Sequence, residues 1–454
     1  MPDTTLSPRL PVRVPLETKK LGILQSLQAA QANIIGIIPE AATQLPIISG
    51  RTAKRWHMLM EPRAIREVLM EKLDQYPKSV VTKNLLKPAI GESLFIAEGA
   101  HWRWQRRTVA PVFSHRNVQA LSPIMTRAAD RSAERIAAAG KRAVNMLDEM
   151  VGATFDVIAD VTFSGDASFD RRNIHHAIDE YISAAGKISI LDVLGAPDWV
   201  PRPSRLRSGQ AMREAKAQAD RAIEARATED ATGTPDLLDL LLAGEDPKSG
   251  RKMTTAELRD NLMTFIVAGH ETTALTLAWS FYLLAFDPAV QDRAREEANA
   301  VLKGRSASRT DVERLTFIRN IIDEALRLYP PGGMISRTAM TTDQLCGHEI
   351  LPDDTVMIPI YALHRHAALW EKPDAFLPDR WDDRESIDRY AYLPFGDGPR
   401  ICIGASFARQ EAIIILATLI SRFRFSAIKG RQPKPVMILT LRPEGGVWLQ
   451  AEPA

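Results

Sequence analysis

The 454-residue sequence predicts a mainly α-helical protein that also contains small β-sheets. Three observations support this fold class. Residues 115–245 are mostly helical by their residue pattern, and residues 254–286 form one long apolar helical pattern. Short alternating runs between 344 and 360, bounded by glycine and proline, predict hairpin strands. The sequence is 45% hydrophobic and 25% charged, which are ordinary values for a globular protein.

The charge balance and the two cysteines exclude several classes of protein. With 58 basic and 56 acidic residues, the net charge of +2 lacks the strongly basic character of a nucleic-acid-binding protein. Cys346 and Cys402 lie far apart and provide no disulfide framework, which fits a reducing cytoplasm. The apolar run 34–38 ends at Pro39, far short of the ~20 residues that a spanning helix needs. We expect a soluble, cytoplasmic protein without a transmembrane anchor, although this run leaves open a weak peripheral membrane contact.

The first 100 residues predict a helix, one or two strands and a second helix, in that order. A proline-punctuated lead precedes the first helix, near Leu21–Ala32, and weak alternation over Ile47–Met60 predicts the strands. Pro62–Leu73 has apolar residues at helical spacing. From Tyr76 to Gly99 there is little periodicity, which predicts a long irregular loop, and such loops are usually functional or mobile.

Aromatic and basic side chains alternate at residues 101–107. If this segment is helical, Trp102 and Arg106 share one face at positions i and i+4. Arg103 and Arg107 share a neighbouring face. A solvated basic helix would show the same pattern, so the cluster alone does not identify a site.

A capping-box pattern at residues 254–257 opens a helix that extends to Phe286. At ~1.5 Å per residue this helix would be about 50 Å long. Its middle, residues 268–273, reads Ala-Gly-His-Glu-Thr-Thr, and glycine and β-branched threonine are poor choices inside a helix. We expect a local break in the hydrogen-bond ladder there. The break would be either a ligand-lined bulge or a kink without chemistry.

Another helix is predicted from Phe317 to Tyr329, where two prolines end it. Glu324 and Arg327 share one face of this helix, and Asp323 is a competing partner for the arginine. An exposed pair of this kind contributes only roughly 0–1 kcal/mol. Further along the chain, residues 436–441 and 446–450 predict a last hairpin.

Residues 395–404 read Phe-Gly-Asp-Gly-Pro-Arg-Ile-Cys-Ile-Gly and run into an apolar helical pattern. A thiolate at Cys402 needs help to stay ionised, and a helix N-terminus or a metal provides it. Gly398 and Gly404 would let a flat ligand approach the backbone, and Arg400 would add a fixed positive charge. The alternative is a buried free cysteine in a glycine- and proline-rich loop.

The pattern Phe-x-x-Gly-x-Arg-x-Cys-x-Gly in this segment resembles the heme-binding loop of the cytochrome P450 family, in which the cysteine thiolate is the proximal iron ligand. The pairs at 102 and 106 and at 324 and 327, and the box 268–273, resemble further signatures of the family and occur in its order. The residues Ile-Cys-Ile-Gly at 401–404 and Ala-Gly-His-Glu-Thr-Thr at 268–273 look closer to the branch with bacterial fatty-acid hydroxylases and eukaryotic members than to the camphor-hydroxylase type. The resemblance covers nearly the whole chain.

This resemblance implies the cytochrome P450 fold for residues 1–454, as a single heme-thiolate catalytic domain without a fused reductase. The β-containing part would comprise about 1–62 and 334–362, with the helical core elsewhere. The implied cofactor is heme b, iron protoporphyrin IX, with Cys402 as the metal ligand. The residues that would bind this cofactor are Trp102, Arg106, Ala268, Gly269, Arg337, Phe395, Arg400, Cys402 and Gly404.

The implied reaction is the insertion of one oxygen atom of O2 into a hydrophobic small-molecule substrate. Glu271 and Thr272 would be the catalytic acid–alcohol pair that supplies protons, and His270 would point away from the heme. Electrons would come from a separate redox partner of ferredoxin or flavodoxin type, because the sequence has no flavin or iron–sulfur signature. The alternatives are a peroxide-driven peroxygenase or isomerase and a non-catalytic heme-thiolate binding or sensor protein, and the acid–alcohol pair argues against both.

The resemblance implies three further features outside the reaction centre. Glu324, Arg327 and Arg380 would form a buried folding triad rather than a catalytic group. Residues of about 166–231 would form a lid over the substrate channel. Arg103 and Arg107, with Arg409 near them, would face the heme surface where an acidic redox partner docks. The alternative is that both arginines are simply solvated.

Overall fold

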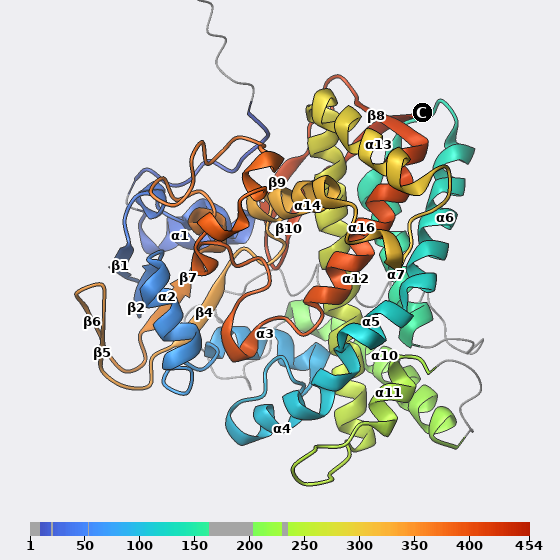
Figure 1. Ribbon diagram of the computed structural model, residues 1–454. Coiled ribbons are helices and arrows are strands. Elements are labelled where there is room, and N and C mark those ends of the chain that lie inside the picture. The colour runs from blue at the N-terminus through green and yellow to red at the C-terminus, as the bar shows by residue number, and fades with distance from the viewer. Residues whose placement is uncertain (1–9, 20, 53, 163–202, 229–234) are drawn as a thin grey trace, which may run out of the picture.

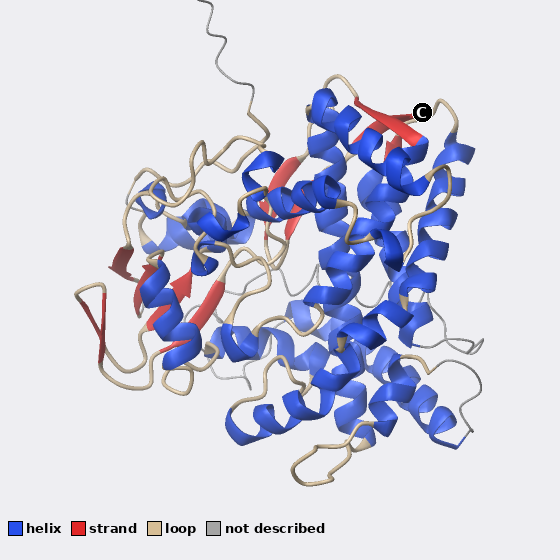
Figure 2. Ribbon diagram, in the orientation of Figure 1, coloured by secondary structure: helices blue, strands red, loops and turns tan. Residues whose placement is uncertain are grey.

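The computed structural model describes residues 10–19, 21–52, 54–162, 203–228 and 235–454. Long helices occupy one side of the molecule and the largest sheet lies on the other (Figures 1 and 2). The predicted mainly α-helical class with small sheets is confirmed. Much of the predicted lid, about 166–231, lies outside the described residues, which omit 163–202 and 229–234. The helices are α1 (Ile23–Ala32), α2 (Pro62–Arg66), α3 (Val80–Ile90), α4 (Gly99–Val109), α5 (His115–Ala120), α6 (Ser122–Ala139), α7 (Met146–Thr162), α10 (Pro203–Thr228), α11 (Leu237–Ala243), α12 (Thr255–Phe286), α13 (Pro288–Leu302), α14 (Thr316–Leu328), α15 (Ile360–Leu363) and α16 (Ala405–Arg422).

The largest sheet joins strands from both ends of the chain. Its order is β1-β2-β7-β4, with β2 parallel to β7 and the other neighbours antiparallel. A second sheet has the order β3-β11-β8, and β5–β6 and β9–β10 are two-stranded hairpins. The strands are β1 (Ile47–Arg51), β2 (Arg55–Leu59), β3 (Val144–Asn145), β4 (Ile335–Thr338), β5 (Asp343–Leu345), β6 (His348–Ile350), β7 (Thr355–Ile358), β8 (Phe423–Ala427), β9 (Lys434–Met437), β10 (Leu441–Glu444) and β11 (Trp448–Pro453).

Helix α12 crosses the molecule without interruption, so the predicted break in its ladder is wrong (Figure 1). Two threonines in this part of α12 satisfy their hydroxyls within the helix. Thr272 Oγ1 donates to the Ala268 carbonyl at 2.7 Å, and Thr276 Oγ1 donates to the Thr272 carbonyl at 2.9 Å. Most of α12 is buried, notably against α7, and this packing outweighs the weak helix propensity of residues 268–273.

Helix α3 occupies much of the stretch 76–99, for which the sequence predicted a long irregular loop. Ser79 caps its start. Val80 and Val81 are exposed and Pro88 lies inside the helix, so the segment shows no clean apolar face. The prediction was wrong because periodicity detects a helix only where one face is consistently buried.

The C-terminal strands pair differently from the predicted hairpin. Strand β9 pairs with β10, as Met437 opposite Leu441 shows, whereas β11 pairs with β8 and β3. Gly445 and Gly446 both have positive φ, at 84° and 79°, and they turn the chain from β10 toward the other sheet. The predicted pairing of 436–441 with 446–450 is therefore wrong.

The buried triad on α14 is present. Arg327 Nε and Nη2 each donate to the Glu324 carboxylate at 2.8 Å, and Arg380 Nε donates at 3.1 Å. Burial opposes ionisation of this carboxyl, but the two arginines outweigh it and lower the pKa of Glu324. Asp323 does not compete for Arg327, because it pairs with Arg384 at 2.7 Å. The contact between Glu324 and Arg380 thus connects α14 to the segment that follows α15.

Among the described residues, no single helix combines the length and the apolar composition needed to cross a membrane. Helices α12 and α13 meet these criteria only when taken together, and they meet at a bend of 115°.

Candidate active site

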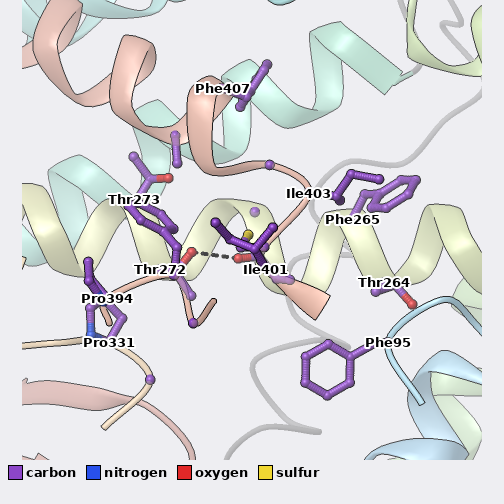
Figure 3. Close-up of a pocket in the computed structure, with 18 of the residues that line it drawn as sticks. Phe95, Thr264, Phe265, Thr272, Thr273, Pro331, Pro394, Ile401, Ile403 and Phe407 are labelled. Atoms are coloured by element: carbon purple, nitrogen blue, oxygen red, sulfur yellow. Dashed lines mark hydrogen bonds between the residues drawn. The ribbon is translucent and has the colours of Figure 1, made fainter. Parts of the chain in front are cut away.

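A cavity of about 410 Å³ lies between helix α12, the loop before α16 and strand β4. Its wall is mainly apolar, and Figure 3 shows Phe95, Phe265, Ile401 and Ile403 around it. These side chains come from segments far apart in the sequence, so the cavity forms only in the folded chain. A mostly apolar cavity with a few polar groups is typical of a small-molecule site.

Cys402 lies in the cavity wall just before α16. Its backbone N–H donates to the Phe395 carbonyl at 2.9 Å, and the Gly404 N–H donates to its sulfur. The Cys402 side chain is exposed to the cavity, yet it lies deep inside the folded chain, and this depth raises the pKa of its thiol more than the Gly404 hydrogen bond and the charges of Arg106 and Lys78 lower it. The start of the helix therefore does not ionise the thiol by itself. A bound metal cation would supply the missing stabilisation.

The two glycines of the loop have different roles. Gly404 lines the cavity, and no atom lies within 4 Å of the place where its Cβ would stand. This opening fits close approach of a flat ligand. Gly398 has a φ of 73°, and a Cβ there would lie 2.4 Å from the Leu69 carbonyl oxygen. The prediction that Gly398 also lets a flat ligand approach the backbone is wrong. This glycine instead lets the loop pack closely on the backbone at Leu69.

Five cationic side chains line the cavity: Lys78, Arg106, Arg337, Arg400 and Arg409. Glu98 forms an ion pair with Arg400. Arg337 Nε is buried and has no hydrogen-bond partner in the part of the chain that the structure describes, although buried polar atoms are normally paired. Burial and the nearby charge of Arg400 lower the pKa of Arg337 to about 10, and burial lowers that of Lys78. An anionic group bound here would satisfy these cations.

Helix α4 brings Trp102 and Arg106 to the cavity together, as their spacing predicted. The Arg400 guanidinium lies 4.4 Å from the centre of a Trp102 ring, a cation–π contact. Sequence reasoning missed Lys78, whose Nζ lies 3.5 Å from the ring centre of Phe95. The hydrophobic periodicity of the sequence says nothing about this lysine. The one feature that could have indicated it is its position directly before Ser79, which caps α3.

The box 268–273 presents its residues to different sides of α12. Ala268, Gly269 and Thr272 line the cavity, and the dashed line in Figure 3 marks a hydrogen bond of Thr272. His270 is buried, and its Nδ1 lies 2.8 Å from the Ile266 carbonyl oxygen within the helix. It is absent from the cavity wall, as the sequence predicted.

Glu271 does not line the cavity. Its Oε1 accepts hydrogen bonds from Thr440 Oγ1 at 2.7 Å and from Arg442 Nε at 2.5 Å. The carboxylate is buried, whereas the Arg442 side chain is 38% exposed. The proposed acid–alcohol pair thus has its alcohol at the cavity and its acid toward strand β10.

Arg107 is not a free docking cation. Its Nε and Nη2 donate to the Asp246 carboxylate at 2.7 and 2.9 Å, and the Asp246 side chain is 2% exposed. Arg103 Nη1 lies 3.1 Å from the exposed carboxylate of Asp74. The alternative that both arginines are simply solvated is therefore wrong for Arg107, which pairs with a buried carboxylate. Partner docking at Arg103 and Arg107 stays a prediction.

The residues around the cavity fit a planar, anionic, metal-containing cofactor. Cys402 offers a thiolate ligand that a metal cation would stabilise, and the unpaired Nε of Arg337 lies in a cationic cluster suited to carboxylates. The open space at Gly404 admits a flat ring.

Comparison with known proteins also indicates a cofactor of this kind, because the proteins that this chain resembles belong to one heme-binding family. The Cytochrome P450 family model matches residues 50–451. Cyclooctatin synthase of Streptomyces melanosporofaciens is 34% identical over 387 residues, covering 84% of this chain and 83% of that protein. Cyclooctat-9-en-7-ol 5-monooxygenase of the same organism is 32% identical, covering 83% and 81%. The crystal structure of the cytochrome P450DA heme domain matches with a TM-score of 0.80 and 27% identity over 90% of each chain. The chain therefore belongs to the cytochrome P450 family and is a heme-thiolate monooxygenase.

Proposed function

We propose that this monooxygenase hydroxylates an apolar small molecule and that residues 1–454 act as one catalytic unit with heme b. The observation that carries the proposal is one mainly apolar cavity that combines the Cys402 thiol, a cationic cluster and the Thr272 hydroxyl.

Cys402 would hold the iron, while Trp102, Arg106, Arg337 and Arg400 would bind the cofactor carboxylates. Lys78 would join them. When bound, heme b would supply the iron at which O2 is activated. Phe395, Ala268, Gly269 and Gly404 would border the ring.

The apolar wall supports an apolar substrate. Phe95, Phe113 and Phe265 line the cavity together with aliphatic side chains. Burial of apolar surface favours binding by roughly 25 cal/mol per Å², so a mainly hydrocarbon molecule gains most in this cavity. The names of the two Streptomyces relatives refer to cyclooctatin and cyclooctat-9-en-7-ol, which makes cyclooctat-9-en-7-ol a suitable first ligand.

Glu271 and Thr272 would divide proton transfer between them. Arg442 is partly exposed and contacts the Glu271 carboxylate, so this acid can exchange protons with solvent on the β10 side. Thr272 presents its hydroxyl at the cavity. The acid would replenish the proton that the hydroxyl gives up.

The electrons would come from a separate ferredoxin- or flavodoxin-type protein. The family implies a redox partner in general, and its type is our proposal.

The proposal is tested first by the spectrum of the ferrous carbon monoxide complex. We expect the red-shifted band that is typical of thiolate ligation, lost in Cys402→Ala and kept in the matched control Cys346→Ala. Cys346 is exposed in the turn between β5 and β6, away from the cavity. If Cys402→Ala keeps the band, or if Cys346→Ala loses it, the ligand assignment is wrong. Addition of cyclooctat-9-en-7-ol should then shift the Soret band of the wild type, and product analysis should show hydroxylation.

A further inference from the structure

Three side chains on the largest sheet form a chain of hydrogen bonds for which the proposed function gives no role. Ser49 lies on β1, His57 lies opposite it on β2, and Asp354 directly precedes β7. Ser49 Oγ lies 2.8 Å from His57 Nδ1, and His57 Nε2 lies 3.1 Å from Asp354 Oδ2. None of the three lines the cavity that holds Cys402. A serine, a histidine and a carboxylate joined in this order are the parts of a nucleophilic triad.

The hydrogen bonds fix where the protons lie. A carboxylate only accepts, so His57 Nε2 carries the ring proton and Nδ1 accepts from the Ser49 hydroxyl. This is the arrangement that a general base needs. Burial lowers the pKa of His57 more than the hydrogen bond and the charge of Asp354 raise it, and the nearby Arg55 and His348 lower it further. The imidazole is therefore neutral, and able to take a proton, near neutral pH.

The three side chains differ in burial as a nucleophilic site requires. His57 is 2% exposed and Asp354 is 5% exposed, whereas Ser49 is exposed at the surface. Asp354 Oδ2 accepts from the Leu351 N–H at 2.8 Å and pairs with Arg55 Nε at 3.2 Å. The base and the carboxylate that orients it are thus held in place, while a molecule in solvent can reach the serine hydroxyl.

Strand β1 also offers a backbone donor beside this hydroxyl. It is the edge strand of the sheet. The Met60 N–H donates to the Pro46 carbonyl at 2.9 Å, so the hydrogen-bonded pairs between β1 and β2 fall at the even-numbered residues of β1. Ser49 is therefore in a non-hydrogen-bonded pair, and its N–H points away from β2 to the open edge. The N–H of the nucleophilic residue itself is a known donor to the oxyanion of acyl transfer.

A second imidazole reaches Ser49 from the β5–β6 hairpin. His348 Nδ1 lies 3.1 Å from Ser49 Oγ, and Arg55 Nη2 donates to the Glu349 carbonyl at 2.6 Å, which connects the hairpin to β2. Figure 1 shows this hairpin and β1 at the same side of the molecule. Because the serine proton points to His57, His348 Nδ1 is the donor in its own contact with the hydroxyl.

We propose that Ser49, His57 and Asp354 form a second active site, which transfers the acyl group of an aryl ester to Ser49 and then to water. Ser49 Oγ attacks the carbonyl carbon while its proton passes to His57 Nδ1. The bond from this carbon to the phenolate oxygen breaks, and the proton on His57 passes to that oxygen. Water then attacks the acyl-serine in the same way, which releases the carboxylic acid and restores the hydroxyl. No redox step or cofactor takes part, so the site works independently of heme.

The surroundings favour an ester with a good leaving group. Arg55 also pairs with Asp354, which reduces the negative charge available to stabilise a protonated His57. The Ser49 N–H is one backbone donor, and a poor leaving group would need stronger stabilisation of the oxyanion. A phenolate departs with little help from proton transfer. Since the site is at an exposed strand edge, a long acyl chain gains little from burial, and a short one such as acetyl suffices.

The covalent step is tested with 4-nitrophenyl acetate and the holoenzyme, without reductant. We expect a burst of 4-nitrophenolate and, by mass spectrometry, an acetyl group on the peptide that contains Ser49. Ser49→Ala should remove this label and lower the burst by at least about tenfold. Ser386→Ala is the matched control, because Ser386 is also exposed but its hydroxyl donates to the Asp383 carbonyl at 2.8 Å. It should keep the wild-type burst.

The role of His57 is tested by the pH dependence of the burst rate. Because the pKa of His57 is lowered, the rate should reach half of its maximum below the ordinary histidine pKa of about 6.5. Asp354→Asn removes the charge that raises this pKa, so the midpoint should move to still lower pH and the maximal rate should fall. If Asp354→Asn does not fold, the wild-type midpoint and Ser49→Ala decide.

The outcomes separate this site from the heme site. Ser49→Ala should lose the acetyl label and keep both the ferrous carbon monoxide band and hydroxylation. An unlabelled Ser49 in the wild type, or an equal burst in Ser49→Ala, overturns the proposal and leaves a structural contact between the two strands. A labelled Ser49 whose pH midpoint is the same in folded Asp354→Asn overturns the triad.

Discussion

Residue-scale chemistry in the cavity is governed by burial and by unpaired cations. The buried Nε of Arg337 has no hydrogen-bond partner among the described residues, and burial lowers the pKa of both Arg337 and Lys78. These side chains lie in an environment that an anion would complete. These buried cations would thus make favourable contacts with a carboxylate ligand.

We predict that Lys78→Met loosens the heme. One charge-assisted hydrogen bond contributes roughly 1.5–3 kcal/mol, so the cofactor should dissociate about ten- to a hundredfold faster. The measurement is heme transfer to an excess of a heme-scavenging apoprotein. Lys83→Met is the matched control, because Lys83 also lies near Glu98 but is absent from the cavity wall. Equal transfer rates for Lys78→Met and wild type would show that Lys78 does not hold the cofactor.

A second prediction at this scale concerns Thr272. Thr272→Ala removes the cavity hydroxyl but leaves the apolar wall intact. It should bind substrate normally and consume reductant, yet form several-fold less product and more hydrogen peroxide, because proton delivery is disturbed. Glu271→Gln should slow turnover more than it changes the product ratio. Wild-type peroxide release in Thr272→Ala would assign the threonine a structural role alone.

Individual helices and strands show which features could be predicted from the sequence and which could not. The pair Trp102 and Arg106 was predicted correctly, since helical spacing fixes which side chains share a face. The same spacing does not say which face meets the cavity, so the orientation of Glu271 toward β10 was not predictable. Helix α3 and Lys78 were missed because neither has a periodic signal. The strand pairing of β11 depends on a glycine turn and on distant chain segments.

The contact between α4 and the turn before α12 gives a prediction at the element scale. Arg107→Glu leaves the Asp246 carboxylate buried beside a like charge, and Arg107 is the main cause of the lowered pKa of Asp246. This variant should lower the melting temperature. The control Arg103→Glu disturbs only an exposed pair with Asp74 and should leave it nearly unchanged. Equal melting temperatures would show that the pair does not anchor the turn.

The α14 triad makes a stronger prediction. Glu324 and Arg327 are both fully buried. Glu324→Ala would leave two buried guanidinium groups without their carboxylate, and breaking a buried pair costs roughly 3–5 kcal/mol. We expect little folded heme protein from this variant, measured by heme absorbance per protein. Normal yields and a normal melting temperature would contradict a folding role for the triad.

At the scale of the whole molecule, the net charge of +2 makes long-range steering of a partner weak. Recognition of a redox protein then depends on local exposed charges. Arg107 is committed to Asp246 and Arg103 faces Asp74, so the exposed cations available for docking are fewer than the sequence indicated.

Buried histidines set the response of the whole fold to acid. Burial lowers the pKa of His57, His364 and His366, and that of His364 falls to about 3. His364 is held neutral in a network in which its Nε2 accepts from the Leu393 N–H at 2.9 Å. The unfolded chain therefore binds more protons than the folded protein below the ordinary histidine pKa of about 6.5.

The free energy of unfolding should consequently fall as the pH drops below about 6.5. Each of the three histidines contributes up to roughly 1.4 kcal/mol per pH unit until its folded pKa is reached. Glu411 acts in the opposite direction, because burial raises its pKa and this favours the folded state as the pH falls toward about 4.3. We expect the histidine contribution to outweigh that of Glu411, so acid destabilises the protein before most carboxylates titrate. Denaturant unfolding between about pH 7 and about pH 5 measures this slope. His364→Gln should reduce the slope, and an unchanged slope would show that His364 is not the buried neutral group inferred here.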